Sequence, residues 1–124
     1  MKNIQLSEYS DDEIIDMLHN GKSDELKQLA ISVAEYHPNY QFAQDLCFFL
    51  LDNENEEIRG NALLGLSFIA RRFKKLDVET LISLLRKYRF TSPKEKSRAE
   101  DAFEDISLFT GVELDELYKE YKNN

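Results

Sequence analysis

Several residue types are scarce in this chain, and each scarcity argues against a class of structure. Its 124 residues include one cysteine, no tryptophan, two prolines and four glycines. A single cysteine cannot form an intramolecular disulfide or a cysteine cluster that holds a metal ion, and we expect Cys47 to be a small buried side chain. Because prolines and glycines mark most turns, their scarcity favours a few helices over many short strands.

Long apolar runs are also missing. The longest, residues 46–51, is far shorter than the roughly 20 residues that cross a bilayer. Residues 1–13 contain no apolar segment of the kind found in signal peptides. From its length and a hydrophobic content of 42%, we predict a single domain over residues 1–124 that is cytoplasmic and has no membrane partner.

Motifs that carry catalysis are absent as well. The chain has no glycine-rich phosphate loop, no H-E-x-x-H or G-x-S-x-G motif, and no Cys/His spacing typical of a metal site. Its two histidines, His19 and His37, lie near the ends of different predicted helices. Neighbouring carboxylates are expected by composition alone, because 24 residues are acidic. We therefore predict no enzyme activity, no catalytic residues, no cofactor and no bound metal.

The chain instead carries a regular series of helix signals. Ser10 and Glu13 have capping-box spacing, which predicts a helix to about residue 19. Ser23 is expected to cap a second helix that runs to about residue 36. Pro38 fits the first turn of a third helix over residues 39–51.

Four more helices follow by the same reasoning. Three of them are expected to begin at residues that favour the N-cap or the first turn: Asn53 or Asn55, Asp77, and Ser92 with Pro93. Gly111 is placed to end the sixth helix, and residues 112–121 form a last amphipathic one. We expect Tyr88 and Tyr121 on the inward faces. No segment alternates apolar and polar residues, so the predicted fold class is all-α with roughly seven helices.

The fourth predicted helix contains two glycines, and its pattern recurs along the chain. A shift of about 37 residues places its small and aliphatic positions over residues 99–106, and a shift of about 36 in the other direction places them over residues 26–34. Gly65 falls on the buried arc of the helix, whereas Gly60 falls off it. A unit of this size holds two helices, and such hairpins stack because one hairpin cannot bury its apolar face alone.

The repeated segment resembles HEAT repeats. The resemblance is carried by residues 57–62, which read EIRGNA, by Gly65-Leu66 and Ile69-Ala70, and by a second copy at residues 98–102. It implies a short HEAT-like α-solenoid of about three helical hairpins. Segments within residues 40–109 are also similar to small bacterial HEAT-like immunity proteins of contact-dependent growth inhibition and polymorphic toxin systems. That resemblance implies an antitoxin that binds and neutralises a cognate toxin domain.

The charges are segregated along the chain. Residues 1–58 contain thirteen acidic and three basic side chains, residues 59–98 three acidic and eleven basic, and residues 99–124 eight acidic and two basic. Such segregation creates a strong surface potential. Because nuclease toxins are typically basic, an acidic inhibitor suits a basic toxin domain such as a ribonuclease. We expect the chain to be a monomer, or a 1:1 heterodimer with this toxin.

The residues expected to bind this partner are exposed acids and aromatics near the third helix and in the C-terminal acidic block. They are Tyr40, Gln44, Asp45, Asp52, Glu54, Glu100, Asp101, Glu104 and Asp105. Each acid could equally lie on a solvated helix face or pair internally with Arg59 or Arg98, and Asp45 in particular could pair with Arg59.

Two alternatives remain open at this point. The chain could be a generic HEAT-like scaffold or adaptor without a toxin partner. It could also be a nucleic-acid-binding HEAT-like protein that uses the basic middle block, although its net charge of −8 argues against direct nucleic-acid contact. Helix C-termini attract basic residues, which accounts for much of that block.

Overall fold

The described residues of the chain form seven α-helices. The computed structural model describes residues 9–87 and 90–123, with side chains up to Lys119, and contains no strand within those ranges. The all-α prediction is therefore confirmed. The helices are α1 (Asp11–Asn20), α2 (Ser23–Tyr36), α3 (Tyr40–Leu51), α4 (Glu56–Phe73), α5 (Val78–Leu85), α6 (Pro93–Thr110) and α7 (Leu114–Asn123). Tyr88 and the side chain of Tyr121 lie outside the described residues.

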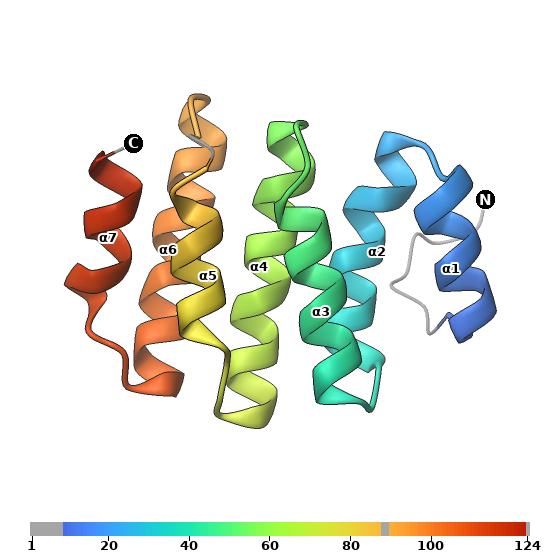
Figure 1. Cartoon of the computed structure of the whole chain (residues 1–124), viewed down its shortest axis with the longest axis horizontal. Coiled ribbons are helices and arrows are strands. Elements are labelled where there is room, and N and C mark those ends of the chain that lie inside the picture. The colour runs from blue at the N-terminus through green and yellow to red at the C-terminus, as the bar shows by residue number, and fades with distance from the viewer. Residues whose placement is uncertain (1–8, 88–89, 124) are drawn as a thin grey trace.

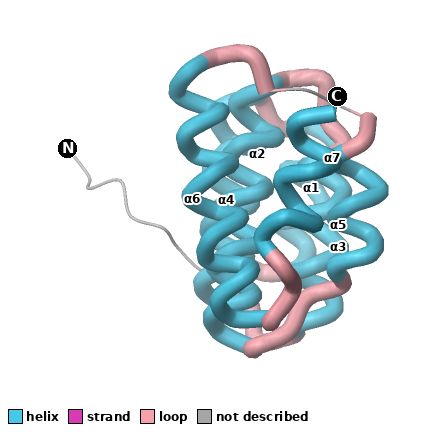
Figure 2. The backbone as a smooth tube through the Cα atoms, turned by 90° about the vertical axis from the view of Figure 1, so that its left-hand side faces the viewer, coloured by secondary structure: helices cyan, strands magenta, loops and turns pink. Residues whose placement is uncertain are grey.

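The helices form two layers, which Figures 1 and 2 show from two directions. One layer contains α2, α4 and α6, and the other contains α1, α3, α5 and α7. Within the first layer, α4 packs directly against both α2 and α6. In the second layer the described parts of α1 and α3 do not contact each other. Helix α4 also packs on α3, so it is the central element of the fold.

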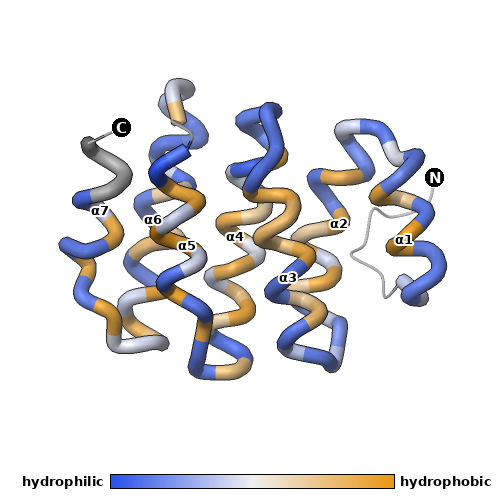
Figure 3. The backbone as a smooth tube through the Cα atoms, viewed as in Figure 1, coloured by the Kyte–Doolittle hydropathy of each residue, from blue (hydrophilic) through white to orange (hydrophobic). Residues whose placement is uncertain are grey.

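The hydrophobic core lies between and within these layers. Hydrophobic positions recur along the helices as short stretches separated by hydrophilic ones (Figure 3). Helix α4 contributes ten buried residues, whereas α1 contributes only Ile14. The largest fully buried side chains include Leu29 of α2, Leu66 and Ile69 of α4, and Phe103 of α6. The three segments matched by the sequence repeat thus supply much of one shared core.

Most of the predicted helix ends are confirmed. Ser10 and Glu13 form the capping box of α1, Asp77 caps α5, and Gly111 ends α6 in the left-handed conformation. Between the two asparagines proposed for α4, Asn55 is the N-cap, and its side-chain oxygen accepts the backbone N–H groups of Glu57 and Ile58. Short-range side-chain chemistry accounts for these ends without any tertiary contact.

Two predicted starts are wrong. Helix α2 begins at Ser23 itself, with Lys22 as the N-cap, because the Glu25 carboxylate accepts the Lys22 backbone N–H at 2.9 Å. Pro38 lies before α3 rather than in its first turn. The Asn39 side chain accepts the Phe42 N–H at 2.9 Å, which makes Asn39 the N-cap and delays the start of α3 to Tyr40.

Both glycines of α4 lie at contacts with other helices. A Cβ atom on Gly65 would lie 2.9 Å from Cys47 Sγ and 3.1 Å from the Ala30 carbonyl oxygen, so glycine allows α2 and α3 to approach α4. Gly60 was expected off the buried arc, but it is buried, and a Cβ there would overlap the Glu95 carboxylate of α6. The buried surface of α4 is wider than one helical stripe because α4 has neighbours on three sides.

Among the described residues, no helix combines the length and the apolar character that crossing a membrane requires.

Candidate partner-binding surfaces

The acidic residues predicted near the third helix lie on the outward side of α3. Asp45 and Asp52 are exposed, and between them lies Phe49, whose side chain is 62% exposed. Lys87 of the α5 end places its Nζ atom 2.9 Å from Asp52 Oδ1, so Asp52 is engaged within the chain. Glu54 follows in the loop and is exposed. An exposed aromatic side chain near carboxylates is one candidate contact surface.

Tyr40 and Gln44, predicted to contact a partner, belong instead to an internal junction. Gln44 is 3% exposed, and its side-chain oxygen accepts the Tyr40 hydroxyl at 2.9 Å and the Asp77 backbone N–H at 2.6 Å. Burial raises the pKa of Tyr40, and the carboxylates of Asp77 and Asp45 raise it further. The expectation that Gln44 is exposed is wrong, because it ties α3 to the start of α5.

Arg59 does not use Asp45 as its described partner. It is 5% exposed, and its Nη1 atom donates to the backbone carbonyls of Asn53 and Glu54 at 3.0 and 2.9 Å. Asp45 instead accepts a hydrogen bond from Gln41, one turn earlier on α3, at 2.9 Å. The arginine therefore holds the α3–α4 loop against α4, and Asp45 stays on the outer surface.

The second predicted acidic group lies on the outward side of α6. Glu100, Asp101 and Glu104 are exposed, and Asp105 is half-buried. None of these four carboxylates has a hydrogen bond or an ion pair with another described residue. Leu108 follows one turn later and is 73% exposed, more than any other large hydrophobic side chain in the described part of the chain. An unpaired acidic face with an apolar residue at its end is thus available to solvent.

The electrostatic effect of these acids reaches the neighbouring helix. Burial raises the pKa of Tyr118 on α7, and the charges of Glu100, Glu104 and Asp101 add to that rise. The Tyr118 ring packs edge-on against Phe103 of α6, with 5.5 Å between ring centroids. A tyrosinate beside several carboxylates is disfavoured by like-charge repulsion. These three carboxylates therefore lie close enough to Tyr118 to disfavour its ionised form.

The structure separates the two predicted acidic groups. Helices α3 and α6 belong to opposite layers and do not contact each other within the described residues, and α4 lies between them (Figures 1 and 2). The predicted site residues are therefore not one surface. A compact partner that covers the α6 face cannot also cover Phe49 and Asp45 of α3.

The cations at the end of α4 are used largely in contacts between helices. Arg72 donates to the backbone carbonyls of Ala34 and His37 at 2.6 and 3.0 Å. The ammonium groups of Lys74 and Lys75 each lie 4.4 Å from the centre of an aromatic ring, that of Phe109 and that of Tyr40 respectively. Such contacts join α4 to α2, α6 and α3. This half of the basic block thus contributes to packing.

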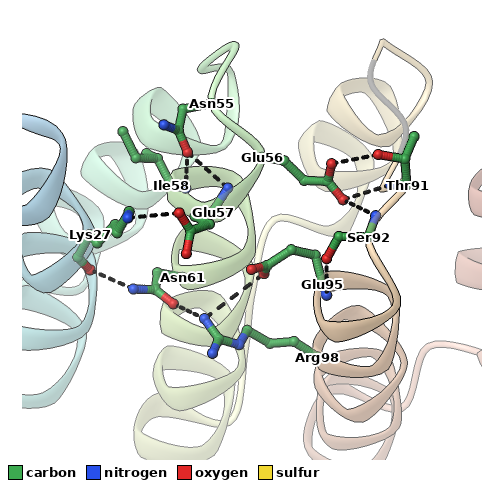
Figure 4. Close-up of polar contacts among 10 residues, drawn as sticks. All are labelled: Lys27, Asn55, Glu56, Glu57, Ile58, Asn61, Thr91, Ser92, Glu95 and Arg98. Atoms are coloured by element: carbon green, nitrogen blue, oxygen red, sulfur yellow. Dashed lines mark hydrogen bonds and ion pairs between the residues drawn. The ribbon is translucent and has the colours of Figure 1, made fainter.

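A polar network joins the three helices of the α2/α4/α6 layer (Figure 4). Lys27 Nζ of α2 lies 2.9 Å from the Glu57 carboxylate, and the Lys27 carbonyl accepts the Asn61 side-chain N–H at 3.1 Å. Arg98 of α6 donates to the other side of the Asn61 carboxamide. The hydrogen bond from Lys27 lowers the pKa of Glu57, and the same bond raises the pKa of Lys27. Asn61 therefore bridges α2 and α6 across α4.

Glu56 makes a second link from α4 to the start of α6. Its carboxylate accepts the Thr91 and Ser92 backbone N–H groups at 2.6 and 2.7 Å and the Thr91 hydroxyl at 2.7 Å. Burial by itself would raise the pKa of Glu56, but these hydrogen bonds and the charge of Arg59 hold it below its ordinary value. Glu56 thereby fixes the loop that leads into the acidic helix.

The remaining polar groups do not form a chemical centre. Within residues 9–87 and 90–119, no group of three or more His, Cys, Asp or Glu side chains is arranged to hold a metal ion. Cys47 is buried, and burial raises its pKa to about 12, so its thiol is unreactive at neutral pH. His37 Nε2 lies 2.9 Å from the Asp11 carboxylate, beside a cavity of about 260 Å³ between α1 and α2.

Neither Leu108 nor Phe49 was among the residues predicted to bind a partner. Each is an apolar residue with two acids at three- or four-residue spacing, Asp45 and Asp52 for Phe49 and Glu104 and Asp105 for Leu108. This exception to the amphipathic pattern is a signal that can be read from a sequence. Comparison with models of known protein families, with curated proteins and with solved structures finds no match.

Proposed function

We propose that this chain is an immunity protein that binds and neutralises a basic toxin domain through the outward face of α6. The observation that carries the proposal is the acidic face formed by the exposed Glu100, Asp101 and Glu104 and the half-buried Asp105, with Leu108 at its end. None of the four carboxylates pairs with another described residue. An apolar anchor within a charged rim is the usual composition of a protein-binding surface. A ribonuclease domain, which must hold a polyanion, would present the complementary basic surface.

We also propose that the two layers are a short HEAT-like solenoid of three helical hairpins followed by α7. Helices α2, α4 and α6 pack closely in one layer, whereas the described parts of α1 and α3 in the other layer do not contact each other. This difference supports an array that curves toward the α2/α4/α6 layer. The inner surface of a curved array is where such folds bind extended partners. The acidic face of α6 belongs to that layer.

The reading frame next to this gene is the first test, because the proposal expects it to encode a toxin-like domain; co-expression with that domain then tests the function. The wild-type chain is expected to restore growth and to co-elute with that domain in gel filtration. The double variant Asp101→Lys/Asp105→Lys is expected to weaken the complex by about tenfold or more, because each reversal replaces attraction with repulsion. A growth defect that the wild-type chain does not relieve, with no complex in gel filtration, would refute the immunity function.

The chain offers a matched control on its opposite layer. Asp45→Lys makes the same charge reversal as Asp101→Lys alone, but on an exposed turn of α3, which the proposal places outside the interface. This control should leave the affinity for the toxin domain unchanged. Circular dichroism should show wild-type helicity for the control and for the α6 double variant. If Asp45→Lys weakens the complex and the α6 variant does not, the interface lies on α3 around Phe49.

A generic scaffold is the second candidate, and the exposed Phe49 favours it. Phe49 and Leu108 lie on opposite layers, so one partner on each would suit an adaptor. Genes of a housekeeping operon around this one, without a toxin-like reading frame, would support the adaptor. A nucleic-acid partner has less support, because Arg72, Lys74, Lys75 and Arg98 contact groups of the chain itself.

A further inference from the structure

The cavity between α1 and α2 has no part in the proposed function. Tyr9 and Asp11 line it at the start of α1, and Tyr36 and His37 line it at the end of α2. Within the described residues, α1 packs on α2 alone. Helix α1 lies at one end of the array, and α4 separates α2 from α6 (Figure 1). The cavity is therefore remote from the acidic face of α6.

The cavity is apolar inside and polar at its mouth. Ile14 of α1 and Val33 of α2 are buried and form its floor. Asp11 and Tyr36 are exposed and lie at the mouth, and Tyr9 is half-buried. Its volume of about 260 Å³ is below the roughly 300–1,000 Å³ of sites that take drug-sized ligands. The cavity therefore suits a ligand about as large as one side chain, with an apolar stem and a polar head.

His37 holds the Asp11 carboxylate in place at the mouth. Its Nδ1 atom accepts the Asn39 backbone N–H at 3.1 Å, so the ring proton lies on Nε2, which donates to Asp11 Oδ1 at 2.9 Å. The ring also stacks on Phe42, with 4.4 Å between ring centroids. Asp11 Oδ2 has no hydrogen bond with a described residue. The neutral imidazole thus leaves the negative charge on Asp11, with one carboxylate oxygen available to a ligand.

The charges around the mouth favour a cation. Two more acids, Asp12 and Glu13, follow in the first turn of α1. None of the described residues that line the cavity is a lysine or an arginine, and Arg72 of α4, which donates to the His37 carbonyl, is not among them. The rings of Tyr9 and Tyr36 add aromatic faces, which attract positive charge. An anion would instead meet like charge at the mouth.

We propose that this cavity binds an organic cation, an ammonium or guanidinium head on a short apolar stem. The head lies against Asp11 Oδ2 and the tyrosine rings, and the stem packs on Ile14 and Val33. A lysine or arginine side chain of a protein presents such a group, and so does a free amine of the same size. The site contains no residue of the α6 face and does not depend on the immunity function.

NMR titration of the full-length chain with side-chain analogues tests the proposal. Butylammonium and propylguanidinium are the probes, and butanol is the neutral control. Both cations should shift the amides of residues 9–14 and 32–38. Butanol should bind about threefold or more weakly than butylammonium, because it lacks the charge that Asp11 attracts. Nα-acetyl-lysine methylamide distinguishes the sources: affinity equal to or above that of butylammonium indicates a protein side chain, and lower affinity indicates a free amine.

Variants of the chain locate the cation. Asp11→Asn keeps an oxygen that can accept the His37 N–H, and it should weaken butylammonium binding about threefold to fivefold, the upper range for an exposed ion pair. Asp12→Asn removes the same charge one residue further along α1, outside the cavity lining, and should leave affinity nearly unchanged. Tyr36→Leu should weaken binding about twofold or more, whereas Tyr36→Phe, which keeps the ring, should not.

Three results would overturn the proposal. Equal affinity for butanol and butylammonium would show that the cavity is merely apolar. Equal effects of Asp12→Asn and Asp11→Asn would show that only the net charge of α1 attracts the cation. Failure of both cations to shift the amides around the cavity would show that it is not a site. Circular dichroism should give wild-type helicity for every variant, which separates loss of binding from loss of fold.

Discussion

Gly60 is the residue at which helix propensity and packing disagree most clearly. Glycine is less favourable than alanine inside a helix by about 1 kcal/mol, yet α4 places one where the Glu95 carboxylate of α6 approaches. Glu95 is 2% exposed, its Oε1 atom has no hydrogen bond with a described residue, and the Arg98 guanidinium lies 3.9 Å away. The missing side chain at Gly60 is what makes room for this buried acid.

A double-mutant cycle tests this explanation. Gly60→Ala should lower the free energy of unfolding by about 1–3 kcal/mol, the usual cost of overpacking. In a Glu95→Ala background the same change should raise it by up to about 1 kcal/mol, because only helix propensity remains. Urea denaturation of the four proteins measures both effects. The same sign in both backgrounds would contradict a clash with Glu95.

Gly65 shows why the sequence placed one glycine correctly and the other wrongly. Its neighbours Leu66 and Ile69 mark the buried arc, so the periodicity alone predicted burial of Gly65. Gly60 faces α6, a second neighbour that one stripe of apolar residues does not reveal. At Gly65 the closest atoms include the Ala30 carbonyl oxygen, which belongs to the backbone and cannot move aside as the Glu95 side chain can.

At the scale of elements, the predicted helix starts were correct where one N-cap was available and wrong where two neighbouring residues could each serve as the N-cap. Ser10, Asp77 and Ser92 were read correctly because each precedes its helix with a side chain that accepts an N–H group of the first turn. Ser23 was misread because Glu25 binds the Lys22 backbone instead. Both arrangements are compatible with the sequence, and only the observed backbone distinguishes them.

The start of α6 depends on a carboxylate from another helix, which gives a pH-dependent contribution to stability. The pKa of Glu56 is lowered in the folded state, because hydrogen bonds from Ser92 and Thr91 outweigh the effect of burial. Its contribution is therefore complete above the unfolded pKa of about 4.3. It is lost as the pH falls through the lower folded pKa. The loop that it holds leads directly into the acidic helix.

Glu56→Gln should reveal this contribution. At pH 7 the variant should be less stable than the wild type, and the difference should shrink as the pH falls from 5 toward 3, because a protonated glutamate resembles glutamine. Chemical denaturation at several pH values measures the difference, and comparing the two proteins at each pH removes the general effect of net charge. A difference that stays constant with pH would show that Glu56 acts only as a neutral acceptor.

At the scale of the whole molecule, charge segregation along the chain becomes segregation in space only in part. Cations such as Arg72, Lys74 and Lys75 bind groups of neighbouring helices, while the α6 acids have no described partner. These contacts are with neutral groups, so the cations keep their charge but hold it at the junctions between helices, whereas Glu100, Asp101 and Glu104 carry theirs at the exposed surface of α6. Long-range attraction of a basic partner follows from this distribution.

The association rate with the toxin domain should fall steeply with added salt. Between low and high ionic strength, the rate constant is expected to drop by about tenfold or more, because screening removes electrostatic steering. The dissociation rate should change less. Stopped-flow mixing measures both constants, and Asp101→Lys/Asp105→Lys should show a flatter salt dependence than the wild type. A rate independent of salt would contradict steering by the α6 face.

The sequence by itself determined the all-α class, most helix ends, the repeated segments and the excess of acid near the C-terminus. Each of these depends on residues a few positions apart, where capping and periodicity act. Only the tertiary structure decided that Gln44 is buried, that the helices carrying the two acidic groups belong to opposite layers, and that Leu64 and Asp101 line one shallow depression. These facts depend on contacts between residues tens of positions apart, which packing fixes and no local pattern encodes.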